Sequence, residues 1–137
     1  MKFEAKTEQR STEYKDFPEG VHEATIARAQ MTRTNDGMRN MIKLRITGEN
    51  EESGFYNITF GDEMGEEQLM FVLTSIMNNG FDIPEEIDYD YNQETVDFLK
   101  NKPVYIEVKN KIYMGKTRGN ITRVLNQEEF DALYEDE

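Results

Sequence analysis

Hydrophobic and polar residues alternate with a period of two between residues 21 and 60, which indicates half-buried β-strands. The alternation is clearest where Ile42, Leu44 and Ile46 occupy every second position between polar neighbours. Thr34-Asn35-Asp36-Gly37 is typical of a hairpin turn, because these residues tolerate the positive φ that tight turns require. The pattern therefore predicts strands over about 21–31, 42–47 and 55–60.

The spacing of apolar residues changes to three and four after this region, which is the spacing of a helix. Leu69, Leu73 and Ile76 share one face of that helix, and Asn79-Gly80 is a typical C-terminal stop. A short second helix is predicted over 93–100. Alternation then resumes and predicts a fourth strand from 104 towards 113, a turn over 115–120 and a fifth strand over 121–125.

Three strands, a helical segment and two further strands follow one another in the order of an OB fold. We therefore predict a mainly β protein, a five-stranded OB-like Greek-key barrel with a helical insertion between strands three and four. Other small barrels and α+β folds share this order of elements. The barrel is expected to span 17–125, between an irregular N-terminal arm over 1–16 and an acidic C-terminal tail over 126–137.

The formal net charge of −12 disfavours a nucleic-acid partner, but the charges are unevenly distributed along the chain. Residues 24–48 hold five basic side chains against one acid, and residues 100–123 hold seven against one. The segment between them, 49–99, has fourteen acids and no Lys or Arg. Because salt screens charges beyond about 8–10 Å, a local basic face can persist on an acidic protein.

The OB topology would bring the two basic segments together on one surface. OB folds bind single strands on strands two and three and on the loops after strands one and four. Lysine and arginine there would contact phosphates, and outward aromatic rings would stack on bases. Core packing is the alternative role for these rings. The predicted DNA-binding residues are Arg33, Arg39, Lys43, Arg45, Phe55, Tyr105, Lys109, Lys111, Tyr113, Lys116 and Arg118.

Signals for catalysis, metals and cofactors are weak. The chain has no cysteine and a single histidine, His22, which lies on a predicted strand. The carboxylates of 49–99 lack EF-hand spacing, and Gly115-Lys116-Thr117 lacks the upstream glycine of a phosphate-binding loop. We therefore expect no enzymatic activity, no metal and no cofactor. Without a signal peptide or membrane span, a cytoplasmic location is expected.

The acidic tail carries three apolar residues, Phe130, Leu133 and Tyr134, among six acids. Such a segment can bind a replication or recombination protein, or compete with DNA for a basic groove. The alternative is a closing helix packed on its own barrel. The sequence does not decide between these, and it leaves self-association into a homo-oligomer open.

Several short motifs together resemble a family of small phage proteins long known only as a domain of unknown function. They are Phe17-Pro18-Glu19-Gly20, Asp36-Gly37, Met41-Ile42-Lys43-Leu44, the strand 55–60, Lys102-Pro103-Val104 and Gly115-Lys116 followed by Asn120. The family is regarded as phage single-stranded-DNA-binding proteins. The resemblance, over about 15–125, implies an OB fold, a role in DNA replication or recombination in the host cytoplasm, and a partner-binding acidic tail.

An acidic DNA mimic is the main alternative function. In that case the fourteen acids of 49–99 would imitate phosphates and occupy the DNA-binding groove of a host nuclease or repressor. A structural or assembly component without a nucleic-acid role is a third alternative. Direct binding to an oligonucleotide distinguishes both from a single-strand-binding protein.

Overall fold

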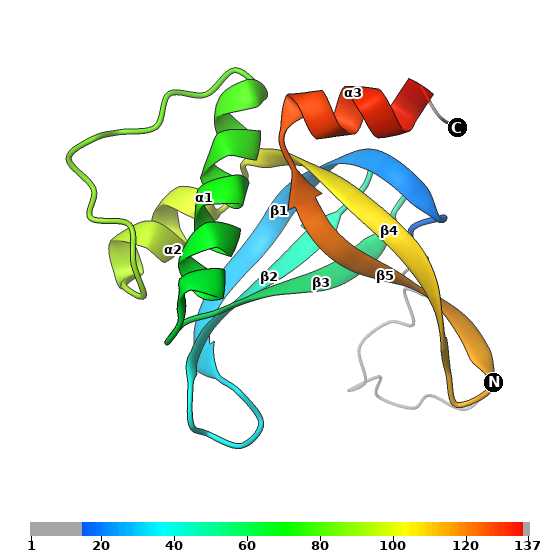
Figure 1. Ribbon diagram of the computed structural model, residues 1–137, viewed down its shortest axis with the longest axis horizontal. Coiled ribbons are helices and arrows are strands. Elements are labelled where there is room, and N and C mark those ends of the chain that lie inside the picture. The colour runs from blue at the N-terminus through cyan, green and yellow to red at the C-terminus, as the bar shows by residue number, and fades with distance from the viewer. Residues whose placement is uncertain (1–14, 136–137) are drawn as a thin grey trace, which may run out of the picture.

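The computed structural model describes residues 15–135, which form one antiparallel sheet and three helices (Figure 1). The sheet has five strands in the order β3-β2-β1-β4-β5, and every neighbouring pair is antiparallel. All five predicted strands are confirmed. Their bounds are β1 Gly20–Arg33, β2 Asn40–Thr47, β3 Ser53–Thr59, β4 Pro103–Tyr113 and β5 Lys116–Leu125.

Two helices, α1 (Glu63–Asn78) and α2 (Gln93–Leu99), lie between β3 and β4, which confirms the predicted helical insertion. Asp62 caps α1 by accepting a hydrogen bond from the Gly65 backbone N–H at 3.1 Å. A side chain at Gly65 would collide with the Thr59 carbonyl, so glycine lets the first turn of α1 pack directly on the end of β3. A third helix, α3 (Gln127–Glu135), occupies most of the predicted tail.

The five strands of the predicted OB-like barrel are present, but they do not close into a barrel, because β3 and β5 contact each other without pairing as strands. The segment from Lys15 to Phe17 lies between them. The Lys15 carbonyl accepts from Ser53 N at 2.8 Å, and the Asp16 carboxylate accepts from Gly119 N at 3.1 Å. Phe17 is buried against this gap. The protein is therefore a mixed α/β fold, a five-stranded antiparallel sheet with three helices that is not closed into a barrel.

The inner face of the sheet and the buried face of α1 form the main core. Leu44 and Ile46 on β2, Ile58 on β3 and Ile106 on β4 are completely buried, as is Ile76 on α1. Each such side chain contributes about 1.5–3 kcal/mol through removal from water. This core sets which residues of each strand point outward, and so fixes the composition of the outer face.

A bulge in β1 changes which of its residues point outward. The pairing with β2 shifts between Ile26 and Arg28, so Ala27 is the extra residue. Ala24 and Ile26 are buried before the bulge and Ala29 is buried after it. Arg28, which uninterrupted alternation would place on the core side, is therefore exposed on the outer face.

Candidate nucleic-acid interface

A row of three outward residues crosses β1, β2 and β3. Arg28 pairs with Arg45, and Arg45 pairs with Phe55. Side chains at directly opposed positions of antiparallel strands share a face, with Cβ atoms about 4.5–5.5 Å apart. The Phe55 ring is 53% exposed, although phenylalanine is usually buried. The row therefore presents two guanidinium groups beside an accessible aromatic ring.

Residues of β5 turn this row into one wall of a groove. Arg118 and Asn120 lie across from Arg28, Arg45 and Phe55 around a hollow of about 560 Å³. Asp16 also lines the groove, and its carboxylate lies 3.9 Å from the Arg118 guanidinium. The groove therefore joins the two basic segments that are distant in the sequence, with three arginines against one acid.

Lys43 extends the groove along β2. Its ammonium lies 4.4 Å from the centroid of the Phe55 ring, a cation–π contact that keeps the charge beside the ring. Lys43, Gln30 and Arg28 border an adjoining hollow of about 240 Å³. Lys43, Arg45 and Phe55 were predicted as site residues and lie together here. Arg28 and Gln30 were not predicted, because only the bulge brings them to this face.

The remaining predicted cations of the second basic segment lie on the β4–β5 hairpin. Lys111 is opposite Arg118, and Lys109 is opposite Asn120. Tyr113 and Lys116 form the last pair before the turn. Because opposed residues share a face, all of these side chains lie on the face that Arg118 presents to the groove. These predicted residues therefore continue the basic surface of the groove along the β4–β5 hairpin.

Two arginines predicted near the β1–β2 turn are engaged locally. Arg39 pairs with Asp62 at 3.0 Å, and Arg33 donates to the Gly37 carbonyl at 3.1 Å. The Gly65 backbone N–H, with a smaller contribution from Arg39, holds the pKa of Asp62 below its usual range. Both arginines remain exposed at the end of the hairpin, but neither lines the groove.

The prediction that Tyr105 is an outward stacking ring needs correction, because α3 covers it. Tyr105 is only 7% exposed, and its ring stacks on that of Phe130 with centroids 4.3 Å apart. Burial raises the pKa of its hydroxyl above the usual value. Val21 and Leu125 complete this small second core, so Tyr105 has a structural role.

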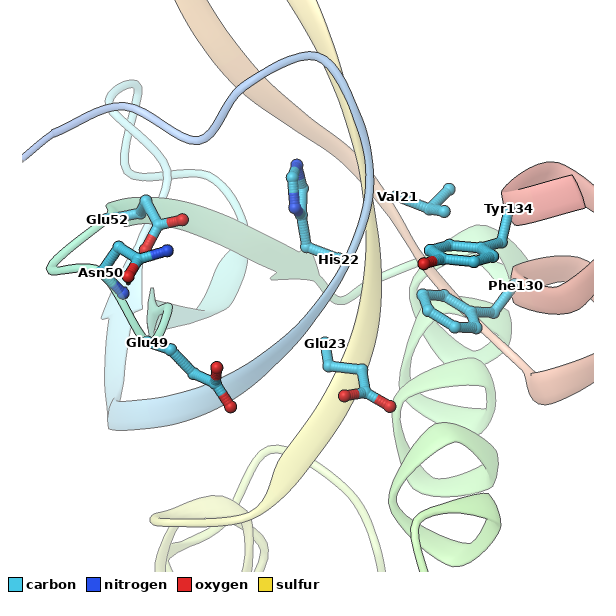
Figure 2. A pocket seen from close by; sticks show the side chains of 8 residues that line it. All are labelled: Val21, His22, Glu23, Glu49, Asn50, Glu52, Phe130 and Tyr134. Carbon is cyan, nitrogen blue, oxygen red and sulfur yellow. Dashed lines mark hydrogen bonds between the residues drawn. The ribbon is translucent and has the colours of Figure 1, made fainter. Parts of the chain in front are cut away.

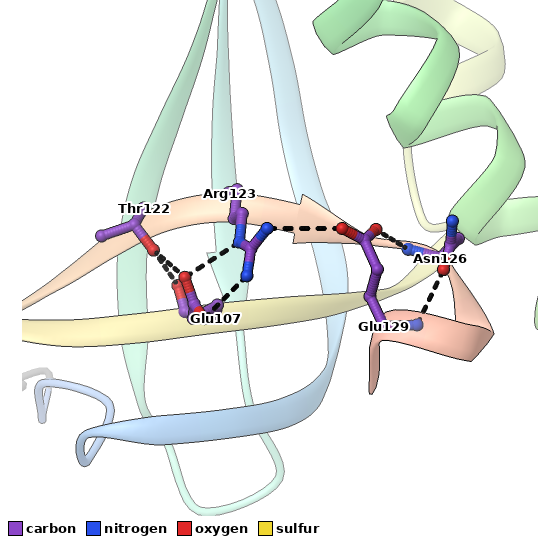
Figure 3. A network of polar contacts seen from close by, with 5 residues as sticks. All are labelled: Glu107, Thr122, Arg123, Asn126 and Glu129. Carbon is purple, nitrogen blue, oxygen red and sulfur yellow. Dashed lines mark hydrogen bonds and ion pairs between the residues drawn. The ribbon is translucent and has the colours of Figure 1, made fainter. Parts of the chain in front are cut away.

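A polar network fixes α3 to the sheet (Figure 3). Glu107 accepts two hydrogen bonds from Arg123, at 3.0 and 3.2 Å, and one from the Thr122 hydroxyl at 2.9 Å. Arg123 also donates to Glu129 at 3.3 Å. Glu129 and Asn126 form a reciprocal capping box, in which each side chain accepts from the other's backbone N–H. The start of α3 is therefore held by charge-assisted bonds.

The three predicted partner-binding residues differ in accessibility. Phe130 and Leu133 pack against the second core, whereas Tyr134 is 62% exposed and stacks on Phe130 with centroids 5.7 Å apart. This arrangement matches the packed closing helix that the sequence left open as an alternative. Of the predicted arm over 1–16, residues 1–14 lie outside the described residues, as do residues 136–137 of the tail.

A separate hollow between β1, the 49–52 loop and α3 has the opposite charge (Figure 2). Glu49 and Glu52 border it on one side, Phe130 and Tyr134 on the other, and Glu23 lies between them. Three carboxylates would repel a phosphate, so this hollow does not extend the basic groove.

Comparisons with protein-family models and with curated protein sequences identify no relative. No protein-family model matches the chain, and no curated protein is similar in sequence. No helix within residues 15–135 combines the length and the apolar character that crossing a bilayer requires.

Proposed function

We propose that this protein binds single-stranded DNA in the basic groove without strong sequence preference and acts in phage-type DNA replication or recombination. The observation that carries the proposal is the placement of Arg28 opposite Arg45, with the exposed Phe55 beside them. Like charges at opposed positions destabilise a sheet by about 0.2–1 kcal/mol. A bound phosphate would offset that cost, because its negative charge would lie between the two positive charges of Arg28 and Arg45.

The combination of ring and cations favours a single strand over duplex DNA. A single strand offers unstacked bases, and stacking on an aromatic side chain contributes about 1–3 kcal/mol per base. In a duplex the base faces are covered by neighbouring pairs, so Phe55 would have no base to stack on. Stacking is also insensitive to base identity, which supports binding without sequence preference.

The net charge of −12 does not prevent this binding, since the acids lie mainly elsewhere. Glu63, Glu66 and Glu67 belong to α1, and Glu128 and Asp131 to α3. In Figure 1 the β4–β5 turn lies away from both helices, whereas α1 begins near the β1–β2 hairpin, where Asp62 pairs with Arg39. At physiological salt their field is screened over about 8 Å, so the groove dominates close to its surface.

Fluorescence anisotropy with a labelled oligo-dT, and with a duplex of equal length, tests the proposal at low and near-physiological salt. We expect tighter binding to oligo-dT and a steep loss of affinity with salt, because cation–phosphate contacts release counterions. Equal affinity for the duplex, or no binding at low salt, would overturn the proposal. The absence of oligo-dT binding at low salt would favour the DNA-mimic alternative.

A paired charge reversal locates the site. Lys43→Glu combined with Arg45→Glu should abolish most oligo-dT binding while changing the free energy of unfolding by about 1 kcal/mol or less. The matched control, Lys100→Glu combined with Lys102→Glu, makes the same change in charge at the end of α2, outside the groove. Equal effects of the two double variants would show that only net charge matters.

A further inference from the structure

The β4–β5 hairpin extends well beyond the rest of the sheet. Pairing between β1 and β4 ends at Gly20 and Val108, whereas β4 and β5 remain paired as far as Tyr113 and Lys116. At about 3.3 Å per residue, the five residues after Val108 carry the turn about 17 Å past the end of β1. Residues 109–118 are all exposed, and Figure 1 shows the hairpin projecting away from the helices.

Three consecutive large apolar residues occupy the end of this hairpin. Ile112 is 75% exposed, Tyr113 63% and Met114 87%. We call Ile112–Met114 the apolar tip. These side chains contribute to neither hydrophobic core. A contiguous exposed apolar cluster of this kind usually marks a contact surface.

The backbone of the turn makes Met114 an unusual choice. Met114 has φ of 50° and Gly115 has φ of 78°, so both central residues of the two-residue turn are left-handed. Such a turn favours Asn-Gly or Asp-Gly, because asparagine, aspartate and glycine tolerate positive φ best. The turn therefore does not account for methionine, whose long apolar side chain stands where asparagine would fit with less strain.

The charges beside the apolar tip match a polyanion. Lys109, Lys111, Lys116 and Arg118 flank it, and residues 109–118 contain no acid. Arg118 also lines the groove, and the tip begins one residue pair beyond it, about 3.3 Å further along the hairpin. A strand leaving the groove past Arg118 would follow these cations to the tip. This linear path suits a nucleic acid better than a flat lipid surface.

We propose that the apolar tip binds the junction where single-stranded DNA becomes duplex, with Ile112 and Met114 packed against the terminal base pair. Isoleucine and methionine are among the apolar side chains that proteins insert at base steps, where they partly unstack the bases. The substrate is then a single-stranded tail continuous with a duplex, such as a fork or a gap. This inference rests on the proposed function, because the groove must hold the tail.

The test uses an oligo-dT tail on a duplex that carries 2-aminopurine in the base pair next to the tail. Binding by the full chain should raise the 2-aminopurine fluorescence, since unstacking relieves its quenching. The test variant combines Ile112→Thr with Met114→Asn. Ile112→Thr keeps a β-branched strand residue, and Met114→Asn introduces a turn residue that tolerates positive φ. This variant should bind plain oligo-dT within about twofold of the wild type but lose the fluorescence rise.

Met38→Gln is the matched control, because Met38 is an equally exposed methionine, at 83%, in the β1–β2 turn. It should keep the fluorescence rise. An unchanged fluorescence in the wild type, or an equal rise in the apolar-tip variant, would overturn the junction proposal while oligo-dT binding still supports the groove. Failure of the wild type to bind oligo-dT would overturn both. If the wild type and Met38→Gln co-sediment with phosphatidylglycerol vesicles and the apolar-tip variant does not, the tip binds membranes instead.

Discussion

Arg28 on β1 and Arg45 on β2 occupy directly opposed positions on the outer face of the sheet. The β-bulge at Ala27 produces this juxtaposition by reversing the alternation of β1 after Ile26. Without the extra residue, Arg28 would point into the core, where an unpaired guanidinium is prohibitively costly. The bulge thus allows an arginine to join the groove while Ala29 returns to the buried face.

Replacing Arg28 with alanine should separate DNA affinity from stability. We expect weaker oligo-dT binding, with the slope of log affinity against log salt reduced by about 0.7 if one phosphate contact is lost. The free energy of unfolding should stay equal or rise by up to about 1 kcal/mol, since a repulsive pair disappears. Anisotropy titrations and urea unfolding measure the two effects. Lys100→Ala, outside the groove, should leave the salt slope unchanged.

Phe55→Leu should weaken oligo-dT binding about fivefold or more, because it removes a stacking ring but keeps an apolar side chain. The ring is half exposed, so the loss of stability should be small. Phe81→Leu is the control, since Phe81 is similarly exposed, at 44%, and lies outside the groove. If both variants bind oligo-dT like the wild type, Phe55 does not stack on bases.

The strands and the helical insertion were predicted well, because the spacing of apolar residues differs between them: every second residue in the strands, and every third or fourth in the helix. Ile42, Leu44 and Ile46 follow a strict alternation that core burial enforces, and all three are completely buried. Arg28 escaped prediction for the opposite reason. The apolar positions shift from Ala24 and Ile26 to Ala29, but the apolar Ala27 between them obscures this shift, and the pairing of β1 with β2 locates the bulge.

Closure of the sheet and the position of α3 depend on contacts between distant segments. Ser53 and Gly119 each bond to the segment before Phe17, and local patterns do not encode such contacts. Tyr105 lies on an outward position of β4, as predicted, but no local pattern identified it as the residue that a closing helix would cover. The capping pair Asn126 and Glu129 was the available signal for a helix there.

Glu107→Gln should destabilise the protein in a pH-dependent way. The Arg123 guanidinium and, to a lesser extent, the Thr122 hydroxyl hold the pKa of Glu107 below its usual range. A carboxyl whose pKa is lower in the folded state stabilises the fold above its unfolded pKa of about 4.3. That contribution is lost as the pH falls through the pKa of Glu107 in the folded state.

The difference in free energy of unfolding between wild type and variant should therefore be largest at neutral pH and shrink in acid, as urea unfolding can measure. A gap independent of pH would contradict an ionised Glu107.

Phe130→Ala tests whether α3 belongs to the fold or acts as an acidic competitor of DNA. Phe130 stacks on Tyr105 and covers Val21 and Leu125, so its truncation should cost about 2 kcal/mol and lower the melting temperature. Because α3 lies outside the groove, oligo-dT affinity should not change. Tyr134→Ala, at a largely exposed position, should cost less.

Deletion of residues 126–137 extends this test. If the segment were a free acidic tail competing for the groove, its removal would tighten oligo-dT binding, most at low salt, and leave the melting temperature unchanged. The contacts of Phe130 and the Arg123–Glu129 ion pair predict the reverse. Loss of α3 would expose Tyr105 and Leu125 to water and leave Glu107 and Arg123 without the helix that flanks them. A destabilised truncation with unchanged DNA affinity would therefore assign α3 to the fold, and a stable truncation with tighter binding would assign it to regulation.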